Sequence, residues 1–232
     1  KGNLPGCWTL FGAWSKLELP VRAPPMLELV LRGLLGWLCH FDYYDMTIVC
    51  WAFFSGILRT GEAVSLRRSH IAVSPVKAVF TFENSKGKSR FGDVEGSEAD
   101  DPEFLLHLEA YLNQLQASDL LLRRSAVEFR AVFKRAMTEL GLQEFGFQPY
   151  SLRRGGATAD FLRHGKMDVT ADKGRWKDRR TARIYVNTAV AARTELRFRA
   201  DQERKLQEFA QVLTHVSQVE DKVFILMGYL FS

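Results

Sequence analysis

The sequence has 232 residues, of which 47% are hydrophobic, so it can bury a core in one domain or slightly more. Its net charge of +5 is unevenly spread, because residues 123–199 hold 18 basic and 8 acidic residues while the rest of the chain is slightly acidic. Such a block predicts a polyanion partner, and nucleic acid rather than a membrane surface, because the block offers no long apolar face. The longest apolar run, Val223–Phe231, is too short to span a bilayer.

The first half of the chain predicts a helical core. After a Trp-, Gly- and Pro-rich lead-in over Lys1–Pro25, apolar residues occupy most faces of Met26–His40, as in a buried helix. Asp45–Leu58 is more apolar still and predicts the central helix, and Gly61–Arg67 predicts a short further helix.

A short β-hairpin is predicted next. Lys77–Phe82 is β-branched and aromatic with alternating polarity, and a turn-rich ENSKGK segment separates it from Ser89–Val94, which can pair with it.

Helices are predicted for the remainder. Ser125 and Glu128 have the spacing of a capping box for a helix that ends at Gly141. A long amphipathic stretch, Ala191–Val216, carries Leu196, Leu206, Phe209 and Leu213 on its apolar side. The other predicted helices are Pro102–Gln116, Ser151–His164, Met167–Lys173 and Asp178–Asn187. The fold class is therefore α+β, mostly α-helical with a small antiparallel β-sheet.

Four short segments carry residues suited to phosphate chemistry. In Ser55–Leu66, Arg59 ends an apolar helix and Glu62 follows three residues later. Lys86-Gly87-Lys88 lies at the hairpin tip. The third segment reads PYSLRRGGATADFLRHG, and the fourth, Gly174–Asn187, reads GRWKDRRTARIYVN. Each alone also fits an ordinary structural role: an ion pair, a solvated turn, a basic helix start, or a packed aromatic.

Arginines at the start of a helix oppose the positive end of the helix dipole. In the third segment, Arg153 and Arg154 stand there directly before Gly155 and Gly156. An anion bound at this helix start would explain the arrangement, and the two glycines would allow the DNA backbone or a neighbouring helix to approach closely.

Together and in this order, the four segments resemble the tyrosine recombinase (phage integrase) family over roughly residues 19–196. The serine-leucine-arginine-arginine-glycine-glycine run and the Gly-Arg-Trp triplet are most similar to recombinases of eukaryotic mobile elements. The resemblance implies a tyrosine recombinase catalytic-domain fold and a metal- and ATP-independent enzyme that breaks and rejoins DNA through a 3′-phosphotyrosine. A type IB topoisomerase shares this chemistry, but the spacing fits recombinases better.

The resemblance also implies residue roles. Arg59 and Arg153 match the two arginines that donate to non-bridging phosphate oxygens, and Tyr185 matches the nucleophile. Lys86, with Lys88 as the alternative register, matches the lysine that protonates the leaving 5′-oxygen. Trp176 matches a phosphate-binding position that is His or Trp in the family. Supporting or DNA-binding roles are expected for Glu62, which would buttress Arg59, and for Arg154, Arg175 and Lys177.

One position departs from the family pattern. The residue three positions before the second arginine is usually His, sometimes Lys or Tyr, and here it is Tyr150. A phenol is a poor general base near neutral pH. The alternative hypothesis is therefore a catalytically weak or inactive recombinase-derived DNA-binding module, and a third is a helical RNA- or protein-binding domain that matches by chance.

These expectations extend to domains and partners. Residues 1–18 would be a lead-in or a remnant of a core-binding region, 19–199 the catalytic domain, and 200–232 a C-terminal helix and apolar tail that serves oligomerisation or packs on its own domain. We expect double-stranded DNA as partner, a homotetramer on DNA, no cofactor and no membrane. Cys7, Cys39 and Cys50 lack disulfide or zinc spacing, which predicts an intracellular location: the nucleus in a eukaryote, the nucleoid in a prokaryote.

Overall fold

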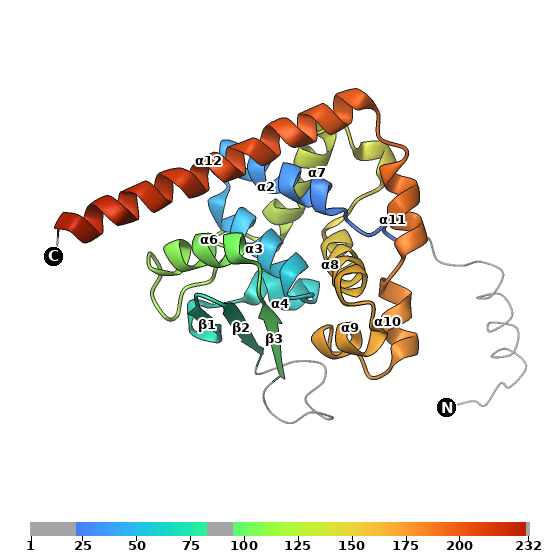
Figure 1. Cartoon of the computed structure of the whole chain (residues 1–232), viewed down its shortest axis with the longest axis horizontal. Coiled ribbons are helices and arrows are strands. Elements are labelled where there is room, and N and C mark those ends of the chain that lie inside the picture. The colour runs from blue at the N-terminus through green and yellow to red at the C-terminus, as the bar shows by residue number, and fades with distance from the viewer. Residues whose placement is uncertain (1–21, 83–94, 231–232) are drawn as a thin grey trace, which may run out of the picture.

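The computed structural model of the chain describes residues 22–82 and 95–230, and for residues 216–230 it describes only the main chain. Helices form most of it, and a three-stranded antiparallel sheet lies at one side (Figure 1). The described part is therefore α+β, as predicted. None of its helices is both long and apolar enough to cross a membrane.

Helices α2 (Glu28–His40) and α3 (Tyr44–Ser55) form the centre of the core. Every residue of α3 from Asp45 to Phe54 is buried, which confirms the central helix predicted from its apolar sequence. Asp45 is acceptable there because it accepts a hydrogen bond from the backbone N–H of Arg123 at 3.0 Å and pairs with the Arg124 guanidinium. α3 ends three residues earlier than predicted, since the chain leaves the helix at Gly56 and Ile57, and Ile57 has φ +47°.

The long C-terminal helix α12 (Ala200–Leu230) crosses α2 at very close range (Figure 1). A Cβ at Gly36 would lie 1.7 Å from the carbonyl oxygen of Phe209, and one at Gly33 would lie 2.4 Å from Leu206. Glycine is therefore required at this crossing. Leu206 and Leu213 are fully buried against the core, as the amphipathic pattern predicted.

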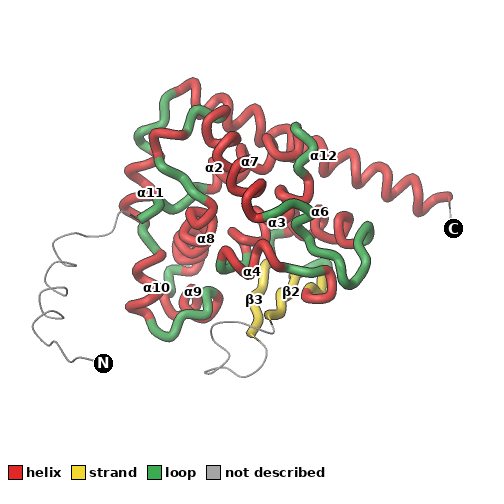
Figure 2. The backbone as a smooth tube through the Cα atoms, turned by 180° about the vertical axis from the view of Figure 1, so that it is seen from behind, coloured by secondary structure: helices red, strands yellow, loops and turns green. Residues whose placement is uncertain are grey.

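The sheet has the order β1-β2-β3, formed by Ile71–Ser74, Lys77–Phe82 and Glu95–Ala99. Figure 2 shows it at one end of the molecule, beside α4 (Thr60–Ser65). β2 has the predicted bounds, but its described partners are β3, with Phe80 opposite Ser97, and the unpredicted β1. The predicted partner strand, Ser89–Val94, lies outside the described residues. β3 was missed because Gly, Ser and Glu favour loops in a sequence reading, and pairing with β2 overrides that preference.

The helices after the sheet largely follow their sequence signals. The capping box at Ser125 and Glu128 is present, and Gly141 has φ +73° after the helix that it ends. The elements in this part are α6 (Pro102–Leu112), α7 (Ala126–Glu139), α8 (Pro149–His164), α9 (Met167–Lys173), α10 (Arg179–Tyr185) and α11 (Thr188–Glu195), with the short 3₁₀ helices η1 (Arg68–His70) and η2 (Gln143–Phe145).

One prediction in this region is wrong. The amphipathic stretch Ala191–Val216 is two helices, α11 and α12, separated by a break at residues 196–199. Leu196 lies in that break and is 87% exposed, so it does not belong to the apolar side.

Two hydrophobic clusters hold these elements together. The main core is large and is built from α2, α3, the sheet, α6, α7 and α12. A separate satellite cluster lies where α8, α9 and α10 meet. The buried members of the satellite cluster are Ile57, Ala157, Ala171, Trp176 and Ala182, with Met167, Tyr185 and Val186 packed against them.

Candidate active site

Three arginines meet where the turn after α3, the first turns of α8 and the turn after α9 come together. They are Arg59, Arg153 and Arg175, which are distant in the sequence. Each of the other two lowers the pKa of Arg153, as nearby cations do. Among the described residues, two carboxylates, Glu62 and Glu95, pair with this cluster, so its described groups carry one more positive than negative charge.

Arg59 is held by both carboxylates. It stands in extended conformation at the N-cap of α4, and its Nη1 donates to Glu62 at 2.6 Å and to Glu95 at 2.9 Å. Burial alone would lower the pKa of Arg59, but the hydrogen bond to Glu95 and the charge of Glu62 outweigh it and raise the pKa. Its side chain stays 28% exposed, so it can still reach a ligand.

Arg153 is one of the largest fully buried side chains in the described residues, at 2% exposure. Its Nη1 donates to the carbonyl of Ile57 and its Nη2 donates to the carbonyl of Gly174 at 2.8 Å. Both acceptors are neutral, and no carboxylate of the described residues forms an ion pair with this guanidinium. Burial, then the charges of Arg175 and Arg59, lower the pKa of Arg153 to about 10. A buried cation with only carbonyl partners favours a bound anion.

Unusual backbone supports this arrangement. Ile57 (φ +47°) and Arg175 (φ +57°), two of the three described non-glycine residues with positive φ, lie at or next to the carbonyls that bind Arg153. A left-handed conformation is costly for a β-branched residue, and such strain persists where the surrounding structure requires it.

Two tyrosines and a tryptophan border the Arg153 guanidinium. Its Cζ lies 4.8 Å from the centre of the Trp176 ring and 5.3 Å from that of Tyr185. The Trp176 and Tyr185 rings lie 4.5 Å apart, and the Tyr150 and Tyr185 rings 5.9 Å apart. Tyr150, Tyr185 and Trp176 therefore lie side by side at this guanidinium.

The environment favours the ionised form of Tyr185. Burial raises its pKa, but the neighbouring Tyr150 hydroxyl and the charge of Arg153 lower it, and the net pKa is below that of free tyrosine. For Tyr150 the direction is opposite, because burial and the neighbouring Tyr185 raise its pKa. Tyr185 is thus the more acidic phenol of the pair.

The glycines after Arg153 serve helix packing. A Cβ at Gly156 would lie 2.0 Å from the carbonyl oxygen of Phe54 in α3, and one at Gly155 would lie 2.2 Å from that of Met26. Of the two approaches that the sequence left open, the described residues show that of a neighbouring helix. This contact presses the first turns of α8 against the end of α3 and so brings Arg153 to the carbonyl of Ile57.

The other predicted residues lie in different environments. Lys177 is exposed after Trp176, whereas Arg154 is only 4% exposed and its Nε has no hydrogen-bond partner. Lys86 and Lys88 lie outside the described residues. The sequence analysis did not identify Glu95 as a site residue, because its strand β3 was not predicted. It could not identify the carbonyls of Ile57 and Gly174, because backbone carbonyls give no signal in a sequence.

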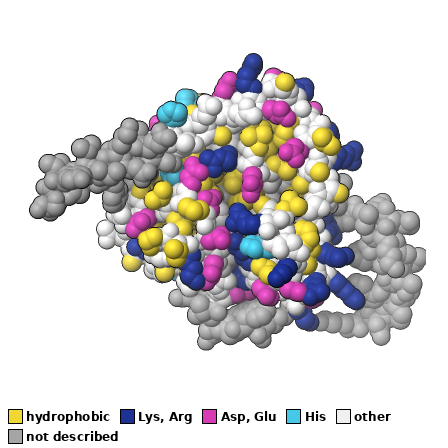
Figure 3. Space-filling view, viewed as in Figure 1, with side chains coloured by type: hydrophobic (Ala, Val, Ile, Leu, Met, Phe, Trp, Pro, Cys, Tyr) yellow, Lys and Arg dark blue, Asp and Glu magenta, His cyan; other side chains and the backbone are white. Residues whose placement is uncertain are grey.

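The surface near the site carries further cations. Lys177, Arg179, Arg180 and Arg183 are all exposed on α10 and the turn before it. Figure 3 shows that basic and acidic side chains are otherwise intermingled over this face of the molecule. The described residues contain no group of three or more His, Cys, Asp or Glu placed to hold a metal ion.

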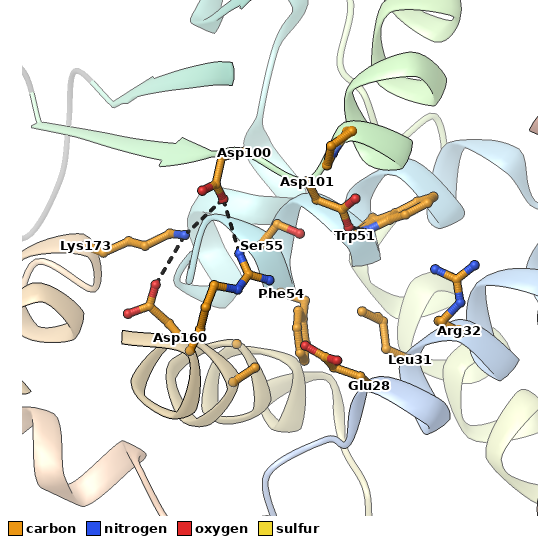
Figure 4. Close-up of a pocket in the computed structure, with 14 residues that line it drawn as sticks. Glu28, Leu31, Arg32, Trp51, Phe54, Ser55, Asp100, Asp101, Asp160 and Lys173 are labelled. Carbon is orange, nitrogen blue, oxygen red and sulfur yellow. Dashed lines mark hydrogen bonds and ion pairs between the residues drawn. The ribbon is translucent and has the colours of Figure 1, made fainter. Parts of the chain in front are cut away.

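A separate cavity of about 340 Å³ lies on another flank of α8 (Figure 4). Within it, Lys173 Nζ lies 3.4 Å from Asp160 and 3.8 Å from Asp100, and Asp100 also pairs with Arg163 at 3.6 Å. Because the lining holds four carboxylates against three basic side chains, this cavity lacks the excess positive charge of the arginine cluster.

Comparison with known proteins gives matches in structure only. No protein-family model and no curated protein sequence matches the chain. Among solved structures, the XerA recombinase is similar at a TM-score of 0.57 with 18% identity, over 78% of this chain and 68% of that one. The Tn1549 transposon integrase in complex with transposon right end DNA is similar at 0.56 with 11% identity, over 77% and 66%.

A third similar structure is the XerH site-specific recombinase bound to palindromic difH substrate, in a post-cleavage complex, with a TM-score of 0.56 and 13% identity over 70% of this chain. The chain spans about half of that recombinase, 49% of its length. At these identities the likeness establishes the fold alone, which is that of tyrosine recombinase catalytic domains. The resemblance to eukaryotic mobile elements stays a prediction.

Proposed function

We propose that this chain, which has the fold of tyrosine recombinase catalytic domains, breaks and rejoins DNA through a 3′-phosphotyrosine formed on Tyr185. The observation that carries the proposal is the environment of that phenol. It packs against Trp176 and Tyr150 and lies beside a buried arginine that has no ion pair with a described carboxylate. The Tyr150 hydroxyl and the charge of Arg153 favour the phenolate, which is the nucleophilic form.

The reaction balances without a cofactor. The Tyr185 phenol loses its proton to solvent water and its oxygen forms a bond to the phosphorus of a phosphodiester, while the bond from phosphorus to the 5′-oxygen breaks. The 5′-oxygen takes up a proton, a role that the sequence predicts for Lys86. Attack by the freed 5′-hydroxyl reverses the step, because the phosphotyrosine link conserves the energy of the original bond.

Arg59 and Arg153 would stabilise the charge that develops on the phosphate. The pentavalent intermediate carries one more negative charge than the diester, and the arginine cluster already has an excess of one positive charge. Donors fixed in place by the fold stabilise such a charge without reorganising. Arg153 is fixed by two carbonyls and Arg59 by two carboxylates.

A second candidate function is a DNA-binding module that no longer cuts. The observation in its favour is Tyr150, whose pKa is raised by burial and by the neighbouring Tyr185. A phenol in that state can donate a hydrogen bond but cannot take the proton of the nucleophile near pH 7. Both candidates predict duplex binding, and only the first predicts a covalent adduct.

The test is to trap that adduct. The chain is incubated with a pool of nicked duplexes of randomised sequence, from which the short fragment that carries the new 5′-hydroxyl diffuses away after cleavage. The adducts are then separated in denaturing gels. We expect an adduct with the native chain and with the control Tyr43→Phe, and none with Tyr185→Phe, while all three bind duplex. An adduct that persists in Tyr185→Phe would show that Tyr185 is not the nucleophile, and binding without any adduct would favour the second candidate.

A further inference from the structure

The backbone at Arg175 has a conformation that glycine usually supplies. After α9, the N–H of Arg175 donates to the carbonyl of Asp172 and the N–H of Trp176 donates to that of Ala171, both at 2.9 Å. This is the Schellman pattern that ends many helices, and its left-handed residue is commonly glycine. Here that residue is Arg175, with φ +57°, and Gly174 stands one position earlier.

No residue with a side chain fits at position 174. A Cβ there would lie 2.0 Å from the ring of Trp176, so this glycine is required for the packing of the tryptophan. Position 175 has no such packing requirement, yet the residue there is an arginine, which costs conformational free energy in the left-handed region. The guanidinium group must therefore compensate for that cost.

The contacts of this guanidinium use only part of its donors. Its side chain is 6% exposed, and its Nη2 donates to Glu62 at 2.7 Å. Its Nε and Nη1 are buried and have no hydrogen-bond partner in the described structure. An unsatisfied buried donor of a charged group is expensive, so two on one side chain indicate a missing acceptor.

A purely structural role explains these facts poorly. If Arg175 only held Glu62 in place, one N–H would suffice, and Arg59 already donates to the other oxygen of that carboxylate. Burial is the main cause of the lowered pKa of Arg175, which means that its charge is poorly compensated in the free chain. Arg175 also adds to the positive field at Arg153.

We propose that Arg175 is a third phosphate-binding arginine, which donates through Nε and Nη1 to a DNA phosphodiester while Nη2 stays on Glu62. This inference rests on the proposed function and adds to it a guanidinium at a position where glycine would suffice for the backbone. The centre of the Phe82 ring lies 4.6 Å from the guanidinium carbon, so this ring covers one face of the group. A phosphodiester supplies the negative charge that the arginine cluster lacks.

The first test compares the salt dependence of duplex binding in Arg175→Gly and in the native chain. Glycine relaxes the left-handed backbone, so the melting temperature should not fall. Loss of one phosphate contact should reduce the slope of log K against log salt by about 1 and weaken binding about tenfold at low salt. The control is Arg135→Met, a change on α7 next to Trp37, which should leave the slope unchanged.

A second measurement uses the native chain and does not depend on a variant that folds. The Nε–H resonance of Arg175, assigned by its loss in Arg175→Lys, is followed while a 16-base-pair duplex is added. We expect a shift that saturates together with binding. An unmoved resonance, or an unchanged slope in Arg175→Gly with a lower melting temperature, would make Arg175 a structural clamp and overturn the proposal. If the native chain does not bind duplex at all, the proposed function itself fails, which is a distinct result.

Discussion

The main core and the satellite cluster differ in the size of their buried side chains and in how far their polar groups are satisfied. The main core contains the large buried rings, among them Trp37, Trp51 and Phe53, and its indole N–H groups donate to carboxylates. The satellite cluster holds three alanines around Trp176, and the indole N–H of Trp176 is buried without a hydrogen bond of normal geometry.

Among the residues that the structure describes, buried donors without a hydrogen-bond partner are also found at the satellite cluster and not in the main core. In the described residues, the buried side-chain N–H groups without a partner belong to Arg154, Arg175 and Trp176, all at or beside the satellite cluster. The difference teaches that the unsatisfied donors, to which the proposed function assigns anion binding, lie apart from the core that stabilises the fold. The main core satisfies its polar groups, and the satellite cluster leaves donors free at some cost in stability.

The largest expected effect is on the main core. Trp51 is fully buried, packs against Phe104 and donates to Asp101 at 3.0 Å. Trp51→Ala should lower the free energy of unfolding by about 3–5 kcal/mol, or about 10²- to 10⁴-fold in the folding equilibrium. Urea titration followed by circular dichroism measures it. A loss below about 1 kcal/mol would mean that the core closes around the gap, and it would contradict the assignment of stability to the main core.

The corresponding substitution of a tryptophan in the satellite cluster should lower the rate of cleavage more than the stability. Trp176→Phe keeps a ring against Arg153 and Tyr185 but removes the N–H donor. We expect adduct formation to slow by about 10²-fold, as for the loss of one oxyanion donor, with a much smaller loss of stability than in Trp51→Ala. The comparison fails if Trp176→Phe unfolds the chain as readily as the change in the main core, or if it leaves the cleavage rate unaltered.

The third prediction concerns the pH dependence of cleavage. Because the Tyr150 hydroxyl helps to lower the pKa of Tyr185, Tyr150→Phe should raise that pKa and displace the rate profile to higher pH. Near pH 7 the rate should fall about tenfold for each unit of displacement, since only the phenolate attacks. The native rate should itself rise from pH 6.5 toward 9.

Histidine at position 150 should change the cleavage rate in the opposite direction. An imidazole can accept the proton of Tyr185, so Tyr150→His should raise the rate at neutral pH by about 10²-fold, at the lower end of general-base effects, and flatten the profile. Single-turnover adduct formation between about pH 6.5 and 9 measures both variants. Identical profiles for the native chain and both variants would show that Tyr150 does not act on Tyr185.

The smallest effect on stability is expected at the C-terminus. The described contacts of α12 with the main core include Leu206 and Leu213, so deletion of residues 219–232 should leave the melting temperature unchanged. If the tail serves oligomerisation, the same deletion should alter the size distribution on DNA measured by light scattering. A lower melting temperature with an unchanged distribution would instead place the tail in the local core.

The elements that the sequence predicted well are those whose signal is local. The apolar run of α3, the capping box of α7 and the alternation of β2 each depend on neighbouring residues, and their positions were predicted closely. Strand β3, whose residues have low β-propensity, and the break at residues 196–199 were missed. Pairing with β2 decides the first, and docking of α12 on α2 decides the second.

For the candidate site, the sequence by itself determined which residue types are present and in what order: Arg59, Arg153, Trp176 and Tyr185. Only the tertiary structure decided how they meet. The Arg153 guanidinium is oriented by the carbonyls of Ile57 and Gly174, and Arg59 by Glu95, groups whose approach depends on close helix packing at Gly156 and on strand pairing. Backbone carbonyls are the same in every residue, so their use as ligands is decided by the path of the chain and leaves no trace in the sequence.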